Sequence, residues 1–289
     1  MSIALFLMPA LLFMTVFLFY PFIMSFVKSF YKTDGFIESI FVGVDNYKRL
    51  IQDATIHIAF INTFKLMFYV CVFQVGFGIV LAILVDGIKR GSKFFRTVYF
   101  FPIVISATAI GMMFKLFYTY DGGLFNSIIL MLNKWIPWLH LESTIWITTK
   151  SALRMIALPT VWQYIGFYFV IVLTAIKQIP RYLYESAYLD GINGFSKTIY
   201  ITLPLIKNQI ITCFILAITG TLKVFDMALV ITEGGPLNQS QILGLYMYQK
   251  AFIDNRFGYG AAISVLIVVL GLSISLLVNK VFKKEDITY

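Results

Sequence analysis

Long, uninterrupted apolar runs dominate this chain. A helix needs about 20 apolar residues to cross the hydrocarbon core of a bilayer. Six stretches meet that length, at residues 3–27, 59–85, 97–118, 152–176, 201–231 and 257–279. Apolar residues follow one another within each run and do not alternate with polar ones, which indicates helices and not the strands of a barrel. The pattern predicts an all-α membrane protein of about six transmembrane helices, with residues 1–289 as one transmembrane domain.

The composition supports a bilayer as the solvent. Hydrophobic residues make up 60% of the chain and charged residues 13%, against about 25% charged residues in soluble domains. The net charge of +9 raises the question of nucleic-acid binding. However, the basic residues lie between the apolar runs and form no stripe with interleaved aromatic residues. They are placed as membrane topology requires, and nucleic-acid binding is disfavoured.

The basic residues also predict an orientation. With both termini in the cytoplasm, the short inner segments carry ten lysines and arginines, whereas the longer outer loops carry eight, offset by acids. The inner set is Lys89, Arg90, Lys93, Arg96, Lys177, Arg181, Lys197, Lys280, Lys283 and Lys284. The positive-inside rule favours this arrangement. The first apolar run lacks a basic leading region and a clear cleavage site, which predicts a retained helix and not a signal peptide.

Two of the expected outer loops have distinctive residues. One contains Asp121-Gly122-Gly123 followed by Trp135 and Trp138. Tryptophan rings suit the headgroup level of a membrane, where an amphipathic ring finds both of its environments. Another contains Gly234-Gly235-Pro236, a turn signal after the fifth run. The segment 41–50, FVGVDNYKRL, mixes apolar anchors with polar groups and is typical of an ordered surface segment.

The most informative segment is the cytoplasmic loop between the fourth and fifth runs. Pro180 suits the first turn of a helix, and Glu185 near that start favours the helix dipole. Gly191 then permits a sharp turn or a close approach that no larger residue allows, and a second short segment leads to Pro204. The loop therefore reads as two short helices at the cytoplasmic surface. A plain connection needs less chain, so this amphipathic loop predicts a docking site for a soluble partner.

The same loop resembles the EAA coupling loop of ABC importer permeases. That pattern is EAA, three residues, G, about nine residues, I, one residue and LP. The chain has Glu185-Ser186-Ala187, Asp190-Gly191 and Ile201-Thr202-Leu203-Pro204. Ser186 replaces the first alanine of the pattern, a change between two small residues. The loop lies between two predicted spans, as the pattern requires.

The resemblance extends over nearly the whole chain, to the carbohydrate branch of these permeases, which handles maltose, multiple sugars and glycerol phosphate. It rests on DNY at 45–47, KFFRTVYFFP at 93–102, Trp162, TEGGP at 232–236 and AFIDNRFGYGAA at 251–262. The GGP loop resembles the first of the two permease types of this branch. The outer loops are too short to hold the large inserted domain of the enteric maltose permease.

The resemblance implies a type I importer permease fold and a set of partners in a bacterial plasma membrane. A second permease would complete the pore, two ATPases would bind ATP and magnesium, and an extracellular binding protein would deliver the sugar. The chain itself would be a multi-pass, non-catalytic subunit without a cofactor. Its coupling loop, residues 177–204, would present Glu185, Ser186, Ala187, Asp190 and Gly191 to an ATPase.

Polar residues inside the apolar runs are candidates for a substrate pocket, since they are costly in hydrocarbon. In the fourth run they form one stripe at i, i+3, i+4 and i+7, namely Thr160, Gln163, Tyr164 and Phe167. The fifth run offers Thr219, Gly220, Thr221, Lys223 and Asp226. The resemblance places substrate residues in these two regions, which makes Thr160, Gln163, Tyr164, Phe167, Gly220 and Thr221 the candidates.

A structural alternative applies to the same residues. Gln163 and the threonines would then hydrogen-bond between helices and hold them together. For Lys223 and Asp226, at i and i+3, we expect an internal ion pair near the outer edge and not a substrate contact.

Other chemical signals are weak. Gly191 to Thr198 reads G-x-x-x-x-S-K-T, but it lacks the second glycine of a phosphate-binding loop and follows a helix, so we expect no nucleotide site in this chain. His57 and His140 have no metal-ligand spacing to other residues, and we expect both in solvated outer loops. Cys71 and Cys213 lie in apolar runs and are expected to be small core hydrophobes.

Two rival functions stay open. One is a permease for another solute, such as glycerol phosphate or an amino acid. An anionic solute favours several cations in its pocket, and Lys223 is the only cation on the two polar stretches. The other rival is a membrane receptor or channel that works without an ATPase, for which the coupling-loop pattern would be accidental.

Overall fold

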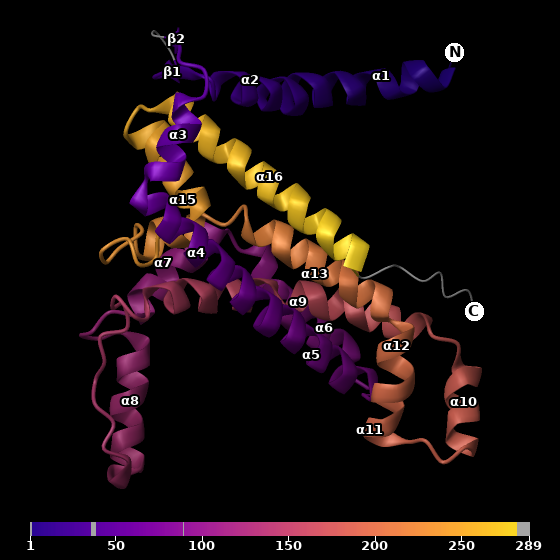
Figure 1. Cartoon of the computed structure of the whole chain (residues 1–289). Helices are drawn as coiled ribbons and strands as arrows, with labels where there is room; N and C mark the ends of the chain where they lie inside the picture. The colour runs from indigo at the N-terminus through magenta and orange to yellow at the C-terminus, as the bar shows by residue number, and fades with distance from the viewer. Residues whose placement is uncertain (1, 36–38, 89, 282–289) are drawn as a thin grey trace.

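The computed structural model describes residues 2–35, 39–88 and 90–281. Lys89, Lys283 and Lys284, which the orientation argument used, lie outside the described residues. Helices make up most of the described chain, and they gather into one elongated bundle with short elements at both ends (Figure 1).

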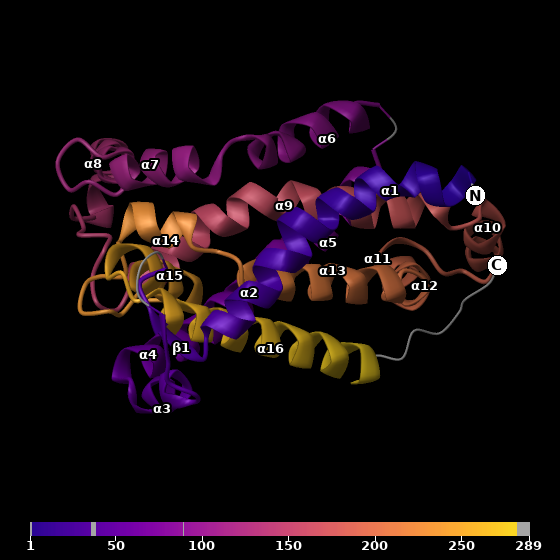
Figure 2. The ribbon, with the colours of Figure 1, turned by 90° about the horizontal axis from the view of Figure 1, so that it is seen from above.

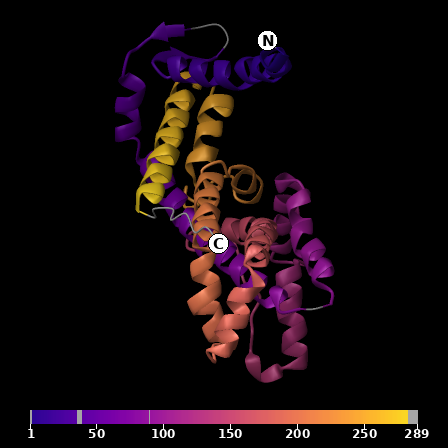
Figure 3. The same ribbon diagram turned by 90° about the vertical axis from the view of Figure 1, so that its right-hand side faces the viewer.

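Four of the six predicted spans are continuous helical segments long enough to cross a membrane. The second, fourth and sixth are α4 (Ala54–Tyr69) with η2 (Val70–Val75) and α5 (Gly76–Asp86), α9 (Ala152–Gln178), and α16 (Phe257–Val281). The first consists of α1 (Ser2–Met14), η1 (Thr15–Phe19) and α2 (Tyr20–Lys28). It stands apart from the bundle over most of its length, and its α2 end contacts α16, where the Ser25 and Ser264 hydroxyls lie 3.1 Å apart (Figures 1 and 3).

The third and fifth predicted spans, over 97–118 and 201–231, are broken by bends and are not single straight helices. The third contains α6 (Ser92–Phe100), η3 (Phe101–Val104) and α7 (Ala107–Phe117), bent by 94° at extended residues 105–106. The fifth bends by 70° between residues 194–205 and α13 (Lys207–Thr221), and resumes after a turn as α14 (Asp226–Ile231). The residues at these breaks are themselves largely apolar, so hydropathy does not reveal them.

The remaining short elements occupy the two ends of the bundle. One end carries the antiparallel hairpin β1 (Tyr31–Thr33) and β2 (Ser39–Phe41), α3 (Asp45–Gln52), α8 (Leu124–Trp135), η4 (Pro137–Leu139), α15 (Leu243–Tyr248) and η6 (Gln249–Ile253). The other end carries α10 (Arg181–Leu189), α11 (Gly194–Lys197), η5 (Thr198–Thr202) and α12 (Leu203–Leu205). The start of α1 and the end of α16 lie toward this second end (Figure 2).

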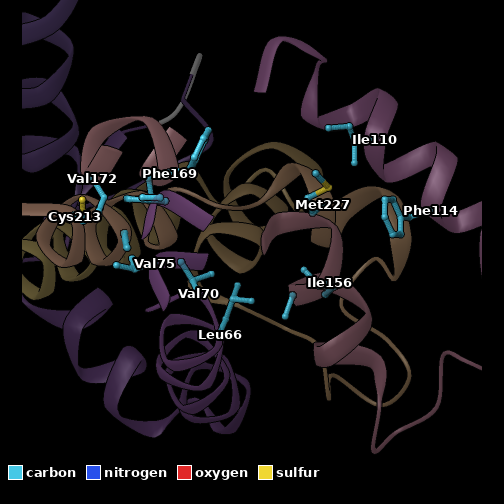
Figure 4. Close-up of a cluster of buried hydrophobic side chains, with 14 of the residues drawn as sticks. Leu66, Val70, Val75, Ile110, Phe114, Ile156, Phe169, Val172, Cys213 and Met227 are labelled. Atoms are coloured by element: carbon cyan, nitrogen blue, oxygen red, sulfur yellow. The ribbon is translucent and has the colours of Figure 1, made fainter. Parts of the chain in front are cut away.

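The main core surrounds α9. Side chains from α4, η2, α7, α13 and α14 pack against it, and Phe169, Val172, Ile156 and Cys213 are fully or almost fully buried there (Figure 4). Cys213 is a buried free thiol inside this cluster, as predicted from its apolar run, and Cys71 is a half-buried free thiol packed against it.

Buried amide side chains hold the irregular segments in place. Each is at most 4% exposed and donates to backbone carbonyls, which lie outside regular helices in every case except that of Gln74. The bonds run from Asn46 to Ser29 and Tyr31, Asn62 to Gln239 and Gln241, Gln74 to Thr160, Asn126 to Tyr120 and Thr144, and Gln163 to Ile105. A buried carbonyl without a partner is costly, so these bonds stabilise the turns and breaks.

A proline inside α9 receives similar compensation. Pro159 has no N–H, so the carbonyl of Met155 loses its helical donor. The Tyr118 hydroxyl, at the end of α7, donates to that carbonyl at 2.9 Å. The fourth span therefore stays one continuous helix of 27 residues despite its proline.

Gly166 sets the distance between α9 and α6. A β-carbon at Gly166 would overlap the Tyr99 carbonyl and the backbone beside it. Backbone atoms cannot rotate away as a long side chain can, so the glycine is needed for this close approach.

Gly166→Ala should therefore destabilise the protein by about 1–3 kcal/mol, the usual cost of overpacking. The measurement is the thermal midpoint of the detergent-purified protein. Gly220→Ala is the matched control, because a β-carbon there meets no atom within 4 Å. Equal midpoints for the two variants would contradict the close packing of α6 on α9.

Candidate functional site

A cavity of about 410 Å³ lies between α9 and α13, beside η2, the third-span break and the start of α14. All six candidate substrate residues line it, namely Thr160, Gln163, Tyr164, Phe167, Gly220 and Thr221. Thr219, Lys223 and Asp226 line it as well. The fold thus brings the polar stripe of the fourth span and the polar residues of the fifth to one space.

Gln163 is engaged between helices. Its side chain is 3% exposed, and Nε2 donates to the Ile105 carbonyl at 3.0 Å. Ile105 lies at the break of the third span, so this bond satisfies a carbonyl that no helix serves. The amide nitrogen of Gln163 therefore forms a hydrogen bond that holds α9 to the third span, as expected if this residue is structural.

The hydroxyls of two candidate threonines are bonded within their own helices. Thr160 donates to the Ile156 carbonyl at 2.8 Å, and Thr221 donates to the Ala217 carbonyl at 2.7 Å. A hydroxyl oxygen that donates in this way keeps its lone pairs and can still accept a hydrogen bond from a ligand.

Tyr164 and Phe167 present aromatic surface to the cavity. The Tyr164 side chain is 37% exposed and Phe167 is half-buried. Of the four stripe residues on α9, Tyr164 is the one most open to a bound molecule.

The expected ion pair between Lys223 and Asp226 is not formed. The ion pairs within the described part of the chain are Lys48–Asp45, Lys115–Glu233 and Lys250–Asp254. α13 ends at Thr221 and α14 begins at Asp226, so a turn separates the two residues and helical i, i+3 spacing does not apply. Both residues line the cavity and add one charge of each sign.

Sequence reasoning missed the part of the cavity wall formed by the second and third spans. Gln74 of η2, Ile103 of η3 and Ala107 of α7 all line it. Gln74 is 2% exposed, and its Nε2 donates to the Thr160 carbonyl at 2.9 Å. Gln74 could have been found from the sequence, because it is a polar amide within an apolar run. Nothing in the sequence pattern distinguishes Ile103 or Ala107.

The loop at the opposite end of α9 has the predicted two-helix form. α10 begins directly after Pro180, whose backbone is not helical, so the proline precedes the helix and does not occupy its first turn. After α10 the Ile192 N–H donates to the Ala187 carbonyl at 2.9 Å, and Gly191 adopts a φ of +79°. Glycine accepts this left-handed conformation without the steric cost of a β-carbon.

The pattern residues of this loop divide into two groups. Glu185, Ser186, Asp190 and Gly191 are exposed, whereas Ala187 is buried beneath them. The loop also carries exposed aromatic and aliphatic side chains, namely Tyr182, Tyr188, Leu189, Phe195 and Tyr200. α10 and α11 project together from the end of the bundle (Figure 1).

Tyr184 joins the two arms of the loop. Its hydroxyl lies 3.2 Å from Thr202 Oγ1 in η5, and the Lys197 ammonium lies 4.9 Å from the centre of its ring. α10 is thereby held against the segment that leads into α13.

A second, polar cavity of about 570 Å³ lies at the hairpin end of the bundle, beside Asp53. Asp53 Oδ2 accepts hydrogen bonds from the Tyr246 and Tyr259 hydroxyls, each at 2.7 Å. Burial raises the pKa of Asp53, but these bonds and those from the Thr55 and Ile56 backbone N–H groups outweigh it and lower the pKa below its ordinary value. The ionised carboxylate thus joins α15 and α16 to the corner between α3 and α4.

The histidines differ in their surroundings. His57 lies in the first turns of α4, not in a loop, and its exposed ring contacts the Ile51 carbonyl at 2.8 Å. His140 is exposed and follows η4 in a loop, as predicted. No group of three or more potential metal ligands occurs within residues 2–35, 39–88 and 90–281.

Known proteins with similar sequences are transporter subunits. The chain is 31% identical to the probable ABC transporter permease protein YurN of Bacillus subtilis, over 98% of this chain and 97% of that protein. It is 31% identical to the lactose transport system permease protein LacF of Rhizobium radiobacter, over 94% of this chain and 91% of that protein. It is 29% identical to the multiple sugar-binding transport system permease protein MsmF of Streptococcus mutans, over 98% of this chain and 95% of that protein.

The fold has a counterpart among solved structures. A chain in the crystal structure of a bacterial alginate ABC transporter, in complex with an alginate pentasaccharide-bound periplasmic protein, superposes with a TM-score of 0.83 at 22% identity, over 98% of this chain and 94% of that chain. The family model for the binding-protein-dependent transport system inner membrane component matches residues 74–285. The chain is a multi-pass membrane protein of that family, the inner membrane components of binding-protein-dependent transport systems.

Proposed function

We propose that this chain forms half of the translocation pathway for a sugar or oligosaccharide in an ATP-driven importer. The observation that carries the proposal is the cavity between α9 and α13, which combines aromatic surface with hydroxyl groups. A second permease completes the pathway, and an extracellular binding protein delivers the substrate. Two ATPase subunits bind ATP and magnesium, so this chain, acting as one transmembrane domain over residues 1–289, has no cofactor and catalyses no reaction.

The chemistry of the cavity favours a neutral, hydroxyl-rich solute. The Tyr164 and Phe167 rings offer a surface for the apolar face of a sugar, and the Thr160 and Thr221 oxygens can accept hydrogen bonds from its hydroxyls. Lys223 and Asp226 contribute opposite charges. An anion such as glycerol phosphate favours a net positive lining, which this wall does not provide. The names of LacF and MsmF support a carbohydrate substrate.

The cytoplasmic loop, residues 177–204, is the proposed contact with the ATPase. Its exposed apolar side chains supply area for docking, and the Glu185 carboxylate can pair with a basic residue of the ATPase. α10 follows α9 after two residues, so the docking element is joined directly to one wall of the cavity.

The start of α1, the end of α16 and the coupling loop lie toward one end of the bundle, which supports an orientation with both termini in the cytoplasm (Figures 1 and 2). The hairpin, α3, α8 and α15 then form the outer surface.

Replacement of Tyr164 should weaken transport without harming the fold. Tyr164→Ala removes a ring and a hydroxyl from the cavity, and the concentration of sugar for half-maximal uptake should rise about tenfold. Gln163→Ala should instead lower the thermal midpoint, because it leaves the partly buried Ile105 carbonyl without its donor, at a cost of about 1–3 kcal/mol. Uptake in reconstituted vesicles and thermal unfolding are the two measurements. Normal uptake by a well-folded Tyr164→Ala complex would remove this residue from the pathway.

Glu185→Lys should weaken attachment of the ATPase by about 1.5–3 kcal/mol, the range for a charge-assisted hydrogen bond. Gly191→Asp should uncouple ATP hydrolysis from uptake, because a φ of +79° disfavours a side chain and the turn after α10 would shift. Subunit stoichiometry, ATPase activity and sugar uptake of the purified complex report the two effects. Glu142→Lys, the same charge reversal on an exposed residue at the opposite end, is the control. Unchanged uptake in both loop variants would show that this loop is not the coupling element.

The orientation can be tested with two near-isosteric substitutions at exposed serines. Ser39→Cys in β2 should react with a membrane-impermeant maleimide in intact cells, and Ser196→Cys in α11 should react only after the cells are opened. The unsubstituted chain, with its cysteines at 71 and 213 inside membrane spans, gives the background. Labelling of Ser196→Cys in intact cells would reverse the orientation and place the coupling loop outside.

A further inference from the structure

The opposite face of α9 forms a second, almost entirely apolar space. A groove of about 640 Å³ runs along it, between α9, the middle of the second span and α7, and Phe125 of α8 also lines it. Aromatic rings dominate its walls, among them Phe73, Phe77, Phe117 and Trp162. Leu158, Trp162 and Ile165 point into this groove, whereas Thr160 and Tyr164 of the same helix point into the proposed sugar cavity. The two spaces are therefore separate.

The groove has the length of one leaflet. α9 has 27 residues, so it is about 40 Å long and exceeds a hydrocarbon core of about 30 Å at both ends. The groove begins at Arg154, the third residue of the helix, and ends at Ile165, its midpoint. The two positions are about 16 Å apart along the helix, so with α9 centred in a bilayer they would lie at the headgroup level and at the middle.

A cation stands at the headgroup end. The Arg154 side chain is exposed, and its guanidinium donates to the Lys150 carbonyl at 3.3 Å. The ion pairs within the described ranges involve other residues. A guanidinium keeps several donors in a planar fork that matches a phosphate, so Arg154 can receive an anionic headgroup.

The properties of α8 also indicate that this end of the groove lies at the headgroup level. Its exposed apolar stripe, Leu124, Ile128, Met131 and Trp135, follows i, i+4, i+7 and i+11 spacing. Asn126 and Asn133 on the other side bond the segment that returns to α9. α8 runs across the direction of α9 and stands apart from the other helices (Figures 1 and 2). An amphipathic helix with this geometry and an exposed tryptophan lies in the plane of a membrane interface.

We propose that this groove binds one acyl chain of an anionic phospholipid of the outer leaflet, with the lipid phosphate on Arg154. The assignment to the outer leaflet rests on the proposed orientation, which the maleimide experiment tests separately. A helix of the second permease is the competing occupant. Such a helix crosses the whole bilayer, whereas the groove stops at the midpoint of α9 and has a cation at its mouth, which fits a lipid better.

The test uses Trp162 as a reporter in the complete complex, reconstituted into phosphatidylcholine vesicles that contain a few mole per cent of phosphatidylglycerol with brominated acyl chains. Brominated chains quench a tryptophan that they touch, and subtraction of the Trp162→Phe complex isolates this residue. Quenching should require about tenfold less brominated phosphatidylglycerol than brominated phosphatidylcholine, the effect of one charge-assisted hydrogen bond. Arg154→Gln should abolish this preference, and Lys134→Gln in α8 should preserve it.

A second variant tests the acyl part of the proposal with the cation intact. Leu158→Trp fills the middle of the groove and should reduce phosphatidylglycerol binding, measured by mass spectrometry of lipid retained on the purified complex. Equal quenching by the two brominated lipids would overturn the proposal, as would a preference that survives Arg154→Gln. Crosslinking of Leu158→Cys to the second permease would assign the groove to that subunit and equally overturn it.

Discussion

Backbone hydrogen bonding in hydrocarbon is the constraint on which this structure depends. A lipid-exposed carbonyl or N–H has no water to pair with, so a spanning chain must satisfy these groups itself. The protein nevertheless bends two of its spans and carries a proline inside α9. It can do so because Gln163 donates a hydrogen bond to the Ile105 carbonyl and Tyr118 donates one to the Met155 carbonyl. The irregularities are thus built together with the side chains that make them tolerable.

These irregularities shape the proposed pathway. The bend of the third span brings η3 and the start of α7 to the cavity, and the end of α13 at Thr221 leaves a turn along its rim. Gln74 and Gln163 both fix α9 to this irregular frame. The polar residues that line the cavity therefore divide into two groups. The amides of Gln74 and Gln163 hold the wall in place, and Tyr164 presents its side chain to the cavity.

Sequence patterns predicted much of this arrangement. Continuous apolar runs gave the spans, because the length of a spanning helix is set by the bilayer and by the helical rise. The spacing of Thr160, Gln163, Tyr164 and Phe167 placed them on one face, and α9 keeps that register because it is unbroken. Gly191 was predicted to permit a sharp turn, and the structure places it in the turn after α10 with a φ of +79°.

The failures share a physical origin. The bends at residues 105–106 and at the end of α13 depend on contacts with other helices, which a count of apolar residues does not contain. The expected pair of Lys223 and Asp226 assumed a helix that had already ended. The Asp53 carboxylate and its two tyrosine partners are distant in sequence, and the apolar groove consists of residues that look like ordinary lipid-facing side chains.

The continuity of α9 has a mechanical and thermodynamic consequence. About 27 Å of unbroken helix separate Thr160 in the cavity wall from Gln178, next to the proposed coupling loop. Over that length a helix acts as a stiff rod, and a tilt of about 10° at one end displaces the other by roughly 5 Å. If the proposed solute binds in the cavity and the proposed ATPase binds the loop, both act on the same rigid helix. By linkage, whatever free energy the bound solute adds to docking of the partner, docking returns in full to binding of the solute.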